Sequence, residues 1–272
     1  MNITSYKRKN IHSGLKGETL SRSGLLSSQD RIVPMKIAPE LNVVKIGGHG
    51  VIDYGAQAIL PLVSEIKELC RTHQMLIMTG GGVRVRHIMD IGIDLGMPTG
   101  VLAELASKVS EQNAIMMSVL LSETGGEYIS NTDLLDVLNL QKLGILPITA
   151  GTPPYGIFEI PPETGIIPQY RTDSGAVIAA EMLGAKSCIL VKNCTGLFDK
   201  NPSLFEDAEL IEEITARELI DMNMDDMVLE YKAVEVLSHC RNLKEIKILN
   251  GHNKGELTKV MNGGKPGTII RR

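Results

Sequence analysis

Short apolar runs alternate along the chain with longer segments in which apolar residues recur at helical spacing, and this alternation constrains the fold more than any other feature. Strands that alternate with helices form a mostly parallel sheet with helices on both faces. We therefore predict an α/β fold, a three-layer sandwich around a mostly parallel central sheet. The predicted strands are Leu41–Ile46, Met75–Met78, Tyr128–Ile129, Leu146–Thr149, Ser187–Lys192, Ile246–Asn250 and Thr268–Ile270. The predicted helices run from about Tyr54 to Thr72, Val83 to Leu95, Val101 to Thr124, Asp173 to Leu183, Thr215 to Asp221 and Val228 to His239.

The composition suits one large α/β domain, because 272 residues can bury a sizeable core without cross-links. The net charge of −4 and an aromatic content of 3% argue against a nucleic-acid partner. No apolar run is long enough to span a membrane, and no export signal precedes the four cysteines. We therefore expect a soluble cytoplasmic protein with free thiols and no membrane contact.

The first forty residues differ from the rest, since they carry seven Lys or Arg against three acidic residues and show no sustained periodicity. We predict an N-terminal arm over residues 1–40 and one domain over residues 41–272. The arm is either a polar segment of no fixed partner or a segment that becomes ordered on a neighbouring subunit.

Two glycine clusters follow the first two predicted strands. Lys45 precedes Gly47-Gly48, and Gly80-Gly81-Gly82 is followed by Arg84 and Arg86. Glycine lets backbone N–H groups approach a ligand closely, and such groups near a helix start suit phosphate oxygens. Each cluster alone is equally consistent with a tight turn. No Lys-Ser or Lys-Thr pair follows the glycines, so a P-loop is disfavoured.

Two further charged residues fall at the same predicted edge of the sheet. Asp173 stands where a helix is expected to begin, and Lys192 ends the predicted strand Ser187–Lys192. Asp173 alone is open to two interpretations: a simple helix N-cap, or a carboxylate that orients lysines or holds Mg²⁺ beside a phosphate. Two lysines and one aspartate together suit phosphoryl transfer, which depends on positioning and on neutralising charge.

These elements occur in the order found in the amino acid kinase family, which the chain resembles over residues 42–272. The resemblance implies an ATP site with Mg²⁺ in which Lys45 and Lys192 contact phosphates and Asp173 orients them. The glycine loops and the segment after Lys192 would bind the nucleotide. The residues implied are Gly47, Gly48, Gly80, Gly81, Gly82, Arg84, Asn193, Thr195, Gly196, Phe198, Asp199, Asn201 and Pro202.

The similarity is closer to the molybdenum storage proteins, a diverged branch of that family, in the Pro153-Pro154-Tyr155 element and in Arg86-His87. It implies a subunit of a homo- or hetero-hexamer in which ATP hydrolysis drives uptake of molybdate or tungstate. Two departures stand out. In one storage subunit a run of histidines follows the Pro-Pro-Tyr element, whereas here that place reads Gly156-Ile157-Phe158-Glu159 and contains no histidine. In addition, Thr195 stands where the family usually has an acidic residue.

Because those histidines are missing, the second ligand stays open at this point. An ATP-binding subunit that handles an oxoanion is the leading hypothesis. The alternatives are a small-molecule kinase, such as a UMP kinase, and a nucleotide-binding assembly protein without catalytic activity. Arg84 and Arg86 suit either an oxoanion or a phosphate acceptor, so they do not distinguish these functions.

Overall fold

The computed structural model describes residues 33–154, 156–159, 165–224 and 226–272. Within it, Lys36–Arg272 packs as one compact unit. Most of the predicted N-terminal arm, residues 1–32, lies outside the described residues, as does Tyr155 of the Pro-Pro-Tyr element. The boundary at residue 40 therefore stays a prediction.

The secondary structure follows the predicted alternation closely. The strands are β1 (Asn42–Ile46), β2 (Met75–Thr79), β3 (Gly126–Tyr128), β4 (Leu146–Ala150), β5 (Ser187–Lys192), β6 (Leu197–Phe198), β7 (Leu210–Ile211), β8 (Glu213–Thr215), β9 (Glu245–Asn250) and β10 (Thr268–Arg271). The α-helices are α2 (Ala56–Leu69), α3 (Val83–Asp94), α4 (Thr99–Leu120), α5 (Val137–Lys142), α6 (Thr172–Leu183), α7 (Ala216–Asp221), α8 (Tyr231–His239) and α9 (Glu256–Met261). Short 3₁₀ turns are η1 (Ile52–Tyr54), η2 (Ser122–Thr124), η3 (Leu134–Asp136) and η4 (Gly156–Phe158).

The central sheet has eight strands in the order β3-β4-β2-β1-β5-β9-β10-β8. The first six of these run parallel to one another. Only β10, which is antiparallel to β9, and β8, which is parallel to β10, run the other way. The prediction of a mostly parallel central sheet is confirmed.

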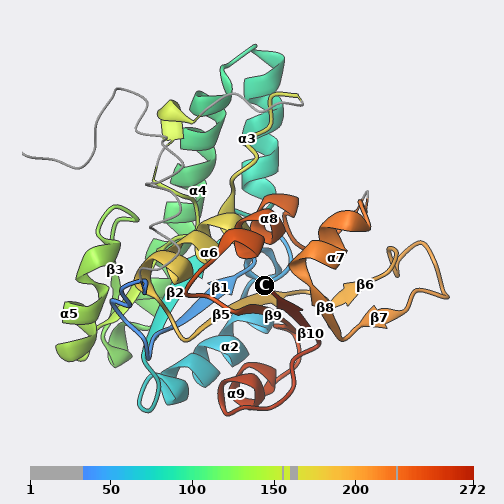
Figure 1. Ribbon diagram of the computed structural model, residues 1–272. Helices are drawn as coiled ribbons and strands as arrows, with labels where there is room; N and C mark the ends of the chain where they lie inside the picture. Colours follow the sequence, from blue (N-terminus) through green and yellow to red (C-terminus); the bar gives the residue numbers. More distant parts are fainter. Residues whose placement is uncertain (1–32, 155, 160–164, 225) are drawn as a thin grey trace, which may run out of the picture. The chain divides into compact units, whose positions relative to one another are not determined.

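Helices cover both faces of this sheet, as Figure 1 shows with α6, α7 and α8 on one side and α2 and α9 on the other. Successive strand residues point to opposite faces of the sheet, so each central strand contributes side chains to two hydrophobic cores, one on each face. On β1, Val43 packs in the core under α6 and α8, whereas Val44 and Ile46 pack in the core over α2 and α9. This arrangement confirms the predicted three-layer sandwich.

Several elements differ from the sequence prediction. The sequence predicts no strand between Lys192 and Thr215, but the strands β6 and β7 lie there and pair as an antiparallel hairpin. Two-residue strands are too short to show a period in the sequence. Helix α8 begins at Tyr231 instead of Val228, because Glu230 has an extended backbone conformation, with φ −67° and ψ 133°. Neither α5, β8 nor α9 was predicted.

Among the described residues, no helix combines the length and the apolar character needed to cross a membrane.

Candidate functional site

The alternation along β1 and β5 directs two lysines to the same face of the sheet. Lys45 lies two residues after Val43, and Lys192 lies two residues after Leu190. Val43 and Leu190 both pack in the core beneath α6. Because β1 and β5 are neighbouring parallel strands, their carboxyl ends lie side by side. The two ammonium groups therefore approach the first turn of α6 together.

Asp173, in the first turn of α6, receives both ammonium groups. Lys45 Nζ lies 2.7 Å from Asp173 Oδ1, and Lys192 Nζ lies 2.6 Å from Asp173 Oδ2. The helix begins one residue earlier, at Thr172, and the carboxylate of Asp173 makes no capping bond to its own helix. The N-cap interpretation of Asp173 is therefore wrong, and the carboxylate instead joins the ends of two strands to a helix.

This charge cluster is removed from water. Asp173 is 3% exposed and Lys45 is 4% exposed, and the side chain of Lys192 is 12% exposed. Desolvation alone would raise the pKa of Asp173, but the charges of Lys192 and Lys45 and their hydrogen bonds hold that pKa below its usual range. Desolvation lowers the pKa of Lys192, and the attraction of Asp173 only partly opposes this effect. Two buried cations thus share one buried anion.

The two glycine loops lie against each other beside this cluster. A Cβ at Gly48 would overlap the backbone of Gly82, so these loops need glycine for their own packing. Gly82 also has φ +75°, a conformation that favours glycine. Asp53 holds the second loop, since Asp53 Oδ2 accepts a hydrogen bond from the Val83 N–H at 2.6 Å. The tight-turn interpretation therefore accounts for part of the glycine pattern.

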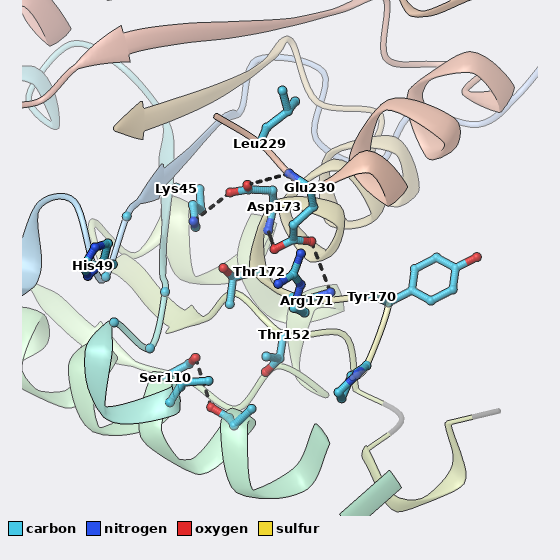
Figure 2. A pocket seen from close by; sticks show the side chains of 18 of the residues that line it. Lys45, His49, Ser110, Thr152, Tyr170, Arg171, Thr172, Asp173, Leu229 and Glu230 are labelled. Atoms are coloured by element: carbon cyan, nitrogen blue, oxygen red, sulfur yellow. Dashed lines mark hydrogen bonds and ion pairs between the residues drawn. The ribbon is translucent and has the colours of Figure 1, made fainter. Parts of the chain in front are cut away.

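A cavity of about 390 Å³ opens at this edge, beyond the carboxyl ends of β1, β2, β4 and β5. Gly47, Gly48 and Gly80–Gly82 line it, together with Asn193. The charged residues that line it are Lys45, Arg86, Arg171, Lys192, Glu159, Asp173 and Glu230, and Figure 2 shows several of them around Asp173. Ligands of open α/β sheets bind at this edge.

Arg86 and Arg171 are the two exposed arginines that line this cavity, and the guanidinium of Arg86 is open to an added anion. No hydrogen bond or ion pair joins the guanidinium of Arg86 to any other residue in the described part of the chain. Arg84 differs, because its guanidinium turns to α4 and donates to Gln112 Oε1 at 3.2 Å and to Asn113 Oδ1. Arg84 does not line the cavity.

The remaining predicted nucleotide residues do not line the cavity either, although Asn193 does. Gly196 packs against Gly267 and Thr268, where an added Cβ would overlap Thr268 Oγ1. Phe198 and Asp199 belong to the β6–β7 hairpin, and Asn201 Nδ2 donates to Asp226 Oδ2 at 2.8 Å. The assignment of Thr195, Gly196, Phe198, Asp199, Asn201 and Pro202 to the nucleotide stays a prediction.

Two acidic residues of the cavity escaped sequence reasoning. Glu230 accepts a hydrogen bond at the start of α6 although it lies 57 residues from Asp173 in the sequence. No local sequence pattern predicts a contact over that separation. Glu159 stands in the Pro-rich connection, and its Oε2 atom is buried without a hydrogen-bond partner. Burial raises the pKa of Glu159.

The chain is similar in sequence to several known proteins. The sequence pattern of the amino acid kinase family matches residues 40–250. The chain is 39% identical to the molybdenum storage protein subunit beta of Azotobacter vinelandii, over 86% of this chain and 87% of that protein. It is 26% identical to the uridylate kinase of Methanobrevibacter smithii, over 84% of this chain and 97% of that enzyme.

Solved structures show the same fold. The uridylate kinase of Archaeoglobus fulgidus superimposes with a TM-score of 0.68 at 19% identity, covering 84% of this chain and 99% of that enzyme. The parallel sheet, the family pattern over most of the chain and the identity to a relative across its length lead to one conclusion. The chain belongs to the amino acid kinase family.

Proposed function

We propose that the chain binds ATP at the carboxyl edge of the sheet and couples ATP hydrolysis to the binding or storage of a small oxoanion such as molybdate or tungstate. The observation that carries this proposal is the buried cluster of Lys45, Asp173 and Lys192. Its two cations outnumber its one anion, and both cations line the cavity, which favours a bound polyanion.

In hydrolysis, the oxygen of water bonds to the γ-phosphorus while the bond to the bridging oxygen breaks, and ADP and phosphate leave with the proton released to solvent. Lys45 and Lys192 would neutralise the charge on the phosphate oxygens. Asp173 is unsuited to act as the base, because both of its oxygens accept hydrogen bonds from lysines and its pKa is lowered. Its role is to hold the two ammonium groups in place.

Mg²⁺ fits this scheme only as a companion of the nucleotide. The described residues contain no group of three or more His, Cys, Asp or Glu side chains that could hold a metal ion. Both oxygens of Asp173 already accept a hydrogen bond from a lysine. Mg²⁺ usually binds through substrate phosphates and keeps several waters, so we infer that it enters with ATP.

The second ligand is proposed to contact Arg86, an exposed cavity cation whose guanidinium bonds to no other residue in the described part of the chain. An oxoanion is favoured over a phosphate acceptor because the storage subunit of Azotobacter vinelandii is 39% identical, against 26% for the uridylate kinase of Methanobrevibacter smithii. The cavity also suits transfer of the γ-phosphoryl group to UMP, and the uridylate kinases of Methanobrevibacter smithii and Archaeoglobus fulgidus match this chain over nearly their full length.

One set of assays separates these functions. The purified protein is incubated with Mg-ATP alone, with molybdate or tungstate, and with UMP, and phosphate, UDP and retained metal are measured. Phosphate release together with retention of molybdenum or tungsten above the Arg86→Ala variant supports the proposal. Formation of UDP without retained metal identifies a kinase. Nucleotide binding without turnover identifies a non-catalytic assembly protein.

We also propose that the chain forms a homo- or hetero-hexamer. The support lies in α4, where Ile115, Met116 and Val119 are 45%, 45% and 68% exposed and lie on one side of the helix. Such apolar groups commonly become covered in assemblies. Light scattering of the purified chain tests the homomeric form: a mass of six chains supports it, and a monomer at all concentrations excludes it.

A further inference from the structure

The first turn of α6 is held by a residue from a distant part of the chain. The first N–H groups of any helix lack partners within the helix. Here they donate to the carboxylate of Glu230: Asp173 N at 2.9 Å to Oε1, and Ser174 N at 3.1 Å to Oε2. Ser174 Oγ donates to Oε2 at 2.8 Å, and the N–H of Arg171 donates to the same atom at 3.2 Å.

The contact between Glu230 and Asp173 is reciprocal. While the N–H of Asp173 donates to Glu230, the N–H of Glu230 donates to Asp173 Oδ2 at 3.2 Å. The same Oδ2 atom accepts from Lys192 at 2.6 Å. Glu230 thus fixes both the backbone and the carboxylate of Asp173, as Figure 2 shows. The orientation of that carboxylate in turn sets where the two ammonium groups lie.

We propose that Glu230 is a positioning residue for nucleotide chemistry, which sets the geometry of Asp173 and, through it, of Lys45 and Lys192. The inference rests on the proposed function. It goes beyond a structural cap because Glu230 lines the cavity and its negative charge acts on the cluster. That charge favours the protonated form of Lys192, against the desolvation that lowers the pKa of this lysine.

The chain offers a matched control. Glu65 of α2 accepts hydrogen bonds at the start of α9 from Gly255 N at 2.7 Å, Thr258 N at 3.0 Å and Thr258 Oγ1 at 2.9 Å. Glu65 thus caps a helix from a distant part of the same chain, as Glu230 does, but Glu65 does not line the cavity. A purely structural effect would therefore be shared by Glu65→Gln and Glu230→Gln, whereas a positioning effect would be confined to Glu230→Gln.

The test combines three measurements on the full chain: the pH midpoint of Lys192 acetylation by trace acetic anhydride, the pH profile of ATP hydrolysis, and unfolding in urea. Glu230→Gln removes a negative charge that favours protonated Lys192. It is therefore expected to move both the midpoint of Lys192 acetylation and the alkaline limb of the ATP-hydrolysis profile to lower pH. It should also lower kcat roughly 10- to 100-fold through misplaced charges. Glu230→Asp, which keeps the charge, should restore the Lys192 midpoint toward the wild-type value. Glu65→Gln should lower stability only.

The inference is overturned if Glu230→Gln loses stability as Glu65→Gln does while the Lys192 midpoint stays at its wild-type value. It is also overturned if the midpoint moves equally in both variants. The acetylation midpoint needs no turnover. A wild-type chain that fails to hydrolyse ATP therefore contradicts the proposed function, whereas an unchanged midpoint contradicts the role of Glu230.

Discussion

The segment after β5 begins directly after Lys192 of the buried cluster, but the polar side chains of the segment and of the cluster find their hydrogen-bond partners in different ways. In the cluster, Lys45 and Asp173 are buried, the side chain of Lys192 is 12% exposed, and both lysines bond to Asp173. In the β6–β7 hairpin, Asp199 is exposed and its Oδ1 accepts from the Glu209 N–H at 2.8 Å. Asn201 Oδ1 similarly accepts from the nearby Ser203 N–H.

This difference has a physical origin. A buried charge must find partners within the fold, because water no longer solvates it. The charges of the cluster are therefore paired with one another. An exposed polar side chain can bond to its own turn or to water at little cost, so the hairpin needs no nucleotide to be satisfied. A role for the hairpin in nucleotide binding has to be tested by measurement.

The largest expected effect comes from Asp173→Asn, which leaves Lys45 and Lys192 buried without an anion. Removing one partner of a buried ion pair costs about 3–5 kcal/mol of unfolding free energy. Phosphate release from ATP should fall to background. Urea unfolding followed by circular dichroism and a phosphate assay measure both changes. Asp199→Asn in the hairpin is the matched control and should stay within about 0.5 kcal/mol of wild type. Equal losses of unfolding free energy in Asp173→Asn and Asp199→Asn would contradict the difference between the buried cluster and the exposed hairpin.

Lys192→Met separates stability from function. The variant retains Lys45 and Asp173 as a neutral pair, and Glu230 N still donates to the freed oxygen, so unfolding free energy should change by less than about 1 kcal/mol. Affinity for ATP should fall roughly 10- to 100-fold, because one charge-assisted contact to phosphate is lost. Titration with a fluorescent nucleotide measures this change. Lys200→Met, which removes the ion pair of Lys200 with Asp207 in the hairpin, should retain wild-type affinity.

The same contrast explains what could be predicted from the sequence. The order of strands and helices was predictable because apolar periodicity records burial, and Lys45 and Lys192 could be placed because parallel strands end at one edge. The contacts of Asp173 were not, since the choice between an N-cap and an ion pair depends on where α6 begins. Glu230 was missed because a hydrogen bond across 57 residues leaves no local pattern. The hairpin was missed because its strands are so short.

A pH series tests whether the cluster is as dehydrated as its burial implies. Because the pKa of Lys192 is lowered in the folded chain, the unfolded chain binds more protons between that pKa and about 10.4, the value for an unperturbed lysine. The contribution of Lys192 to unfolding free energy therefore rises with pH across this window. The difference between wild type and Lys192→Met, measured by urea unfolding from pH 7 to 10, should increase in favour of wild type. A difference in unfolding free energy that stays constant from pH 7 to 10 would mean that the pKa of Lys192 is not lowered, and hence that its ammonium group is solvated by water.

The smallest effect is expected in the hairpin, and Asn201→Ala measures it. Asn201 Nδ2 bonds to Asp226 Oδ2 at 2.8 Å, and this bond joins the hairpin to the segment just before Glu230. If the hairpin holds the nucleoside, losing this bond should raise KM for ATP about 3- to 10-fold, the equivalent of one neutral hydrogen bond, and leave kcat unchanged. Steady-state phosphate release gives both constants.

Asp226→Asn keeps an acceptor for the amide of Asn201 and serves as the control, with KM close to wild type. A fall in kcat without a change in KM would instead show that the Asn201 bond acts on Glu230 and the buried cluster. An unchanged KM in Asn201→Ala would remove the hairpin from the nucleotide site. Nucleotide recognition would then rest on Asn193 and the glycine loops, which already line the cavity.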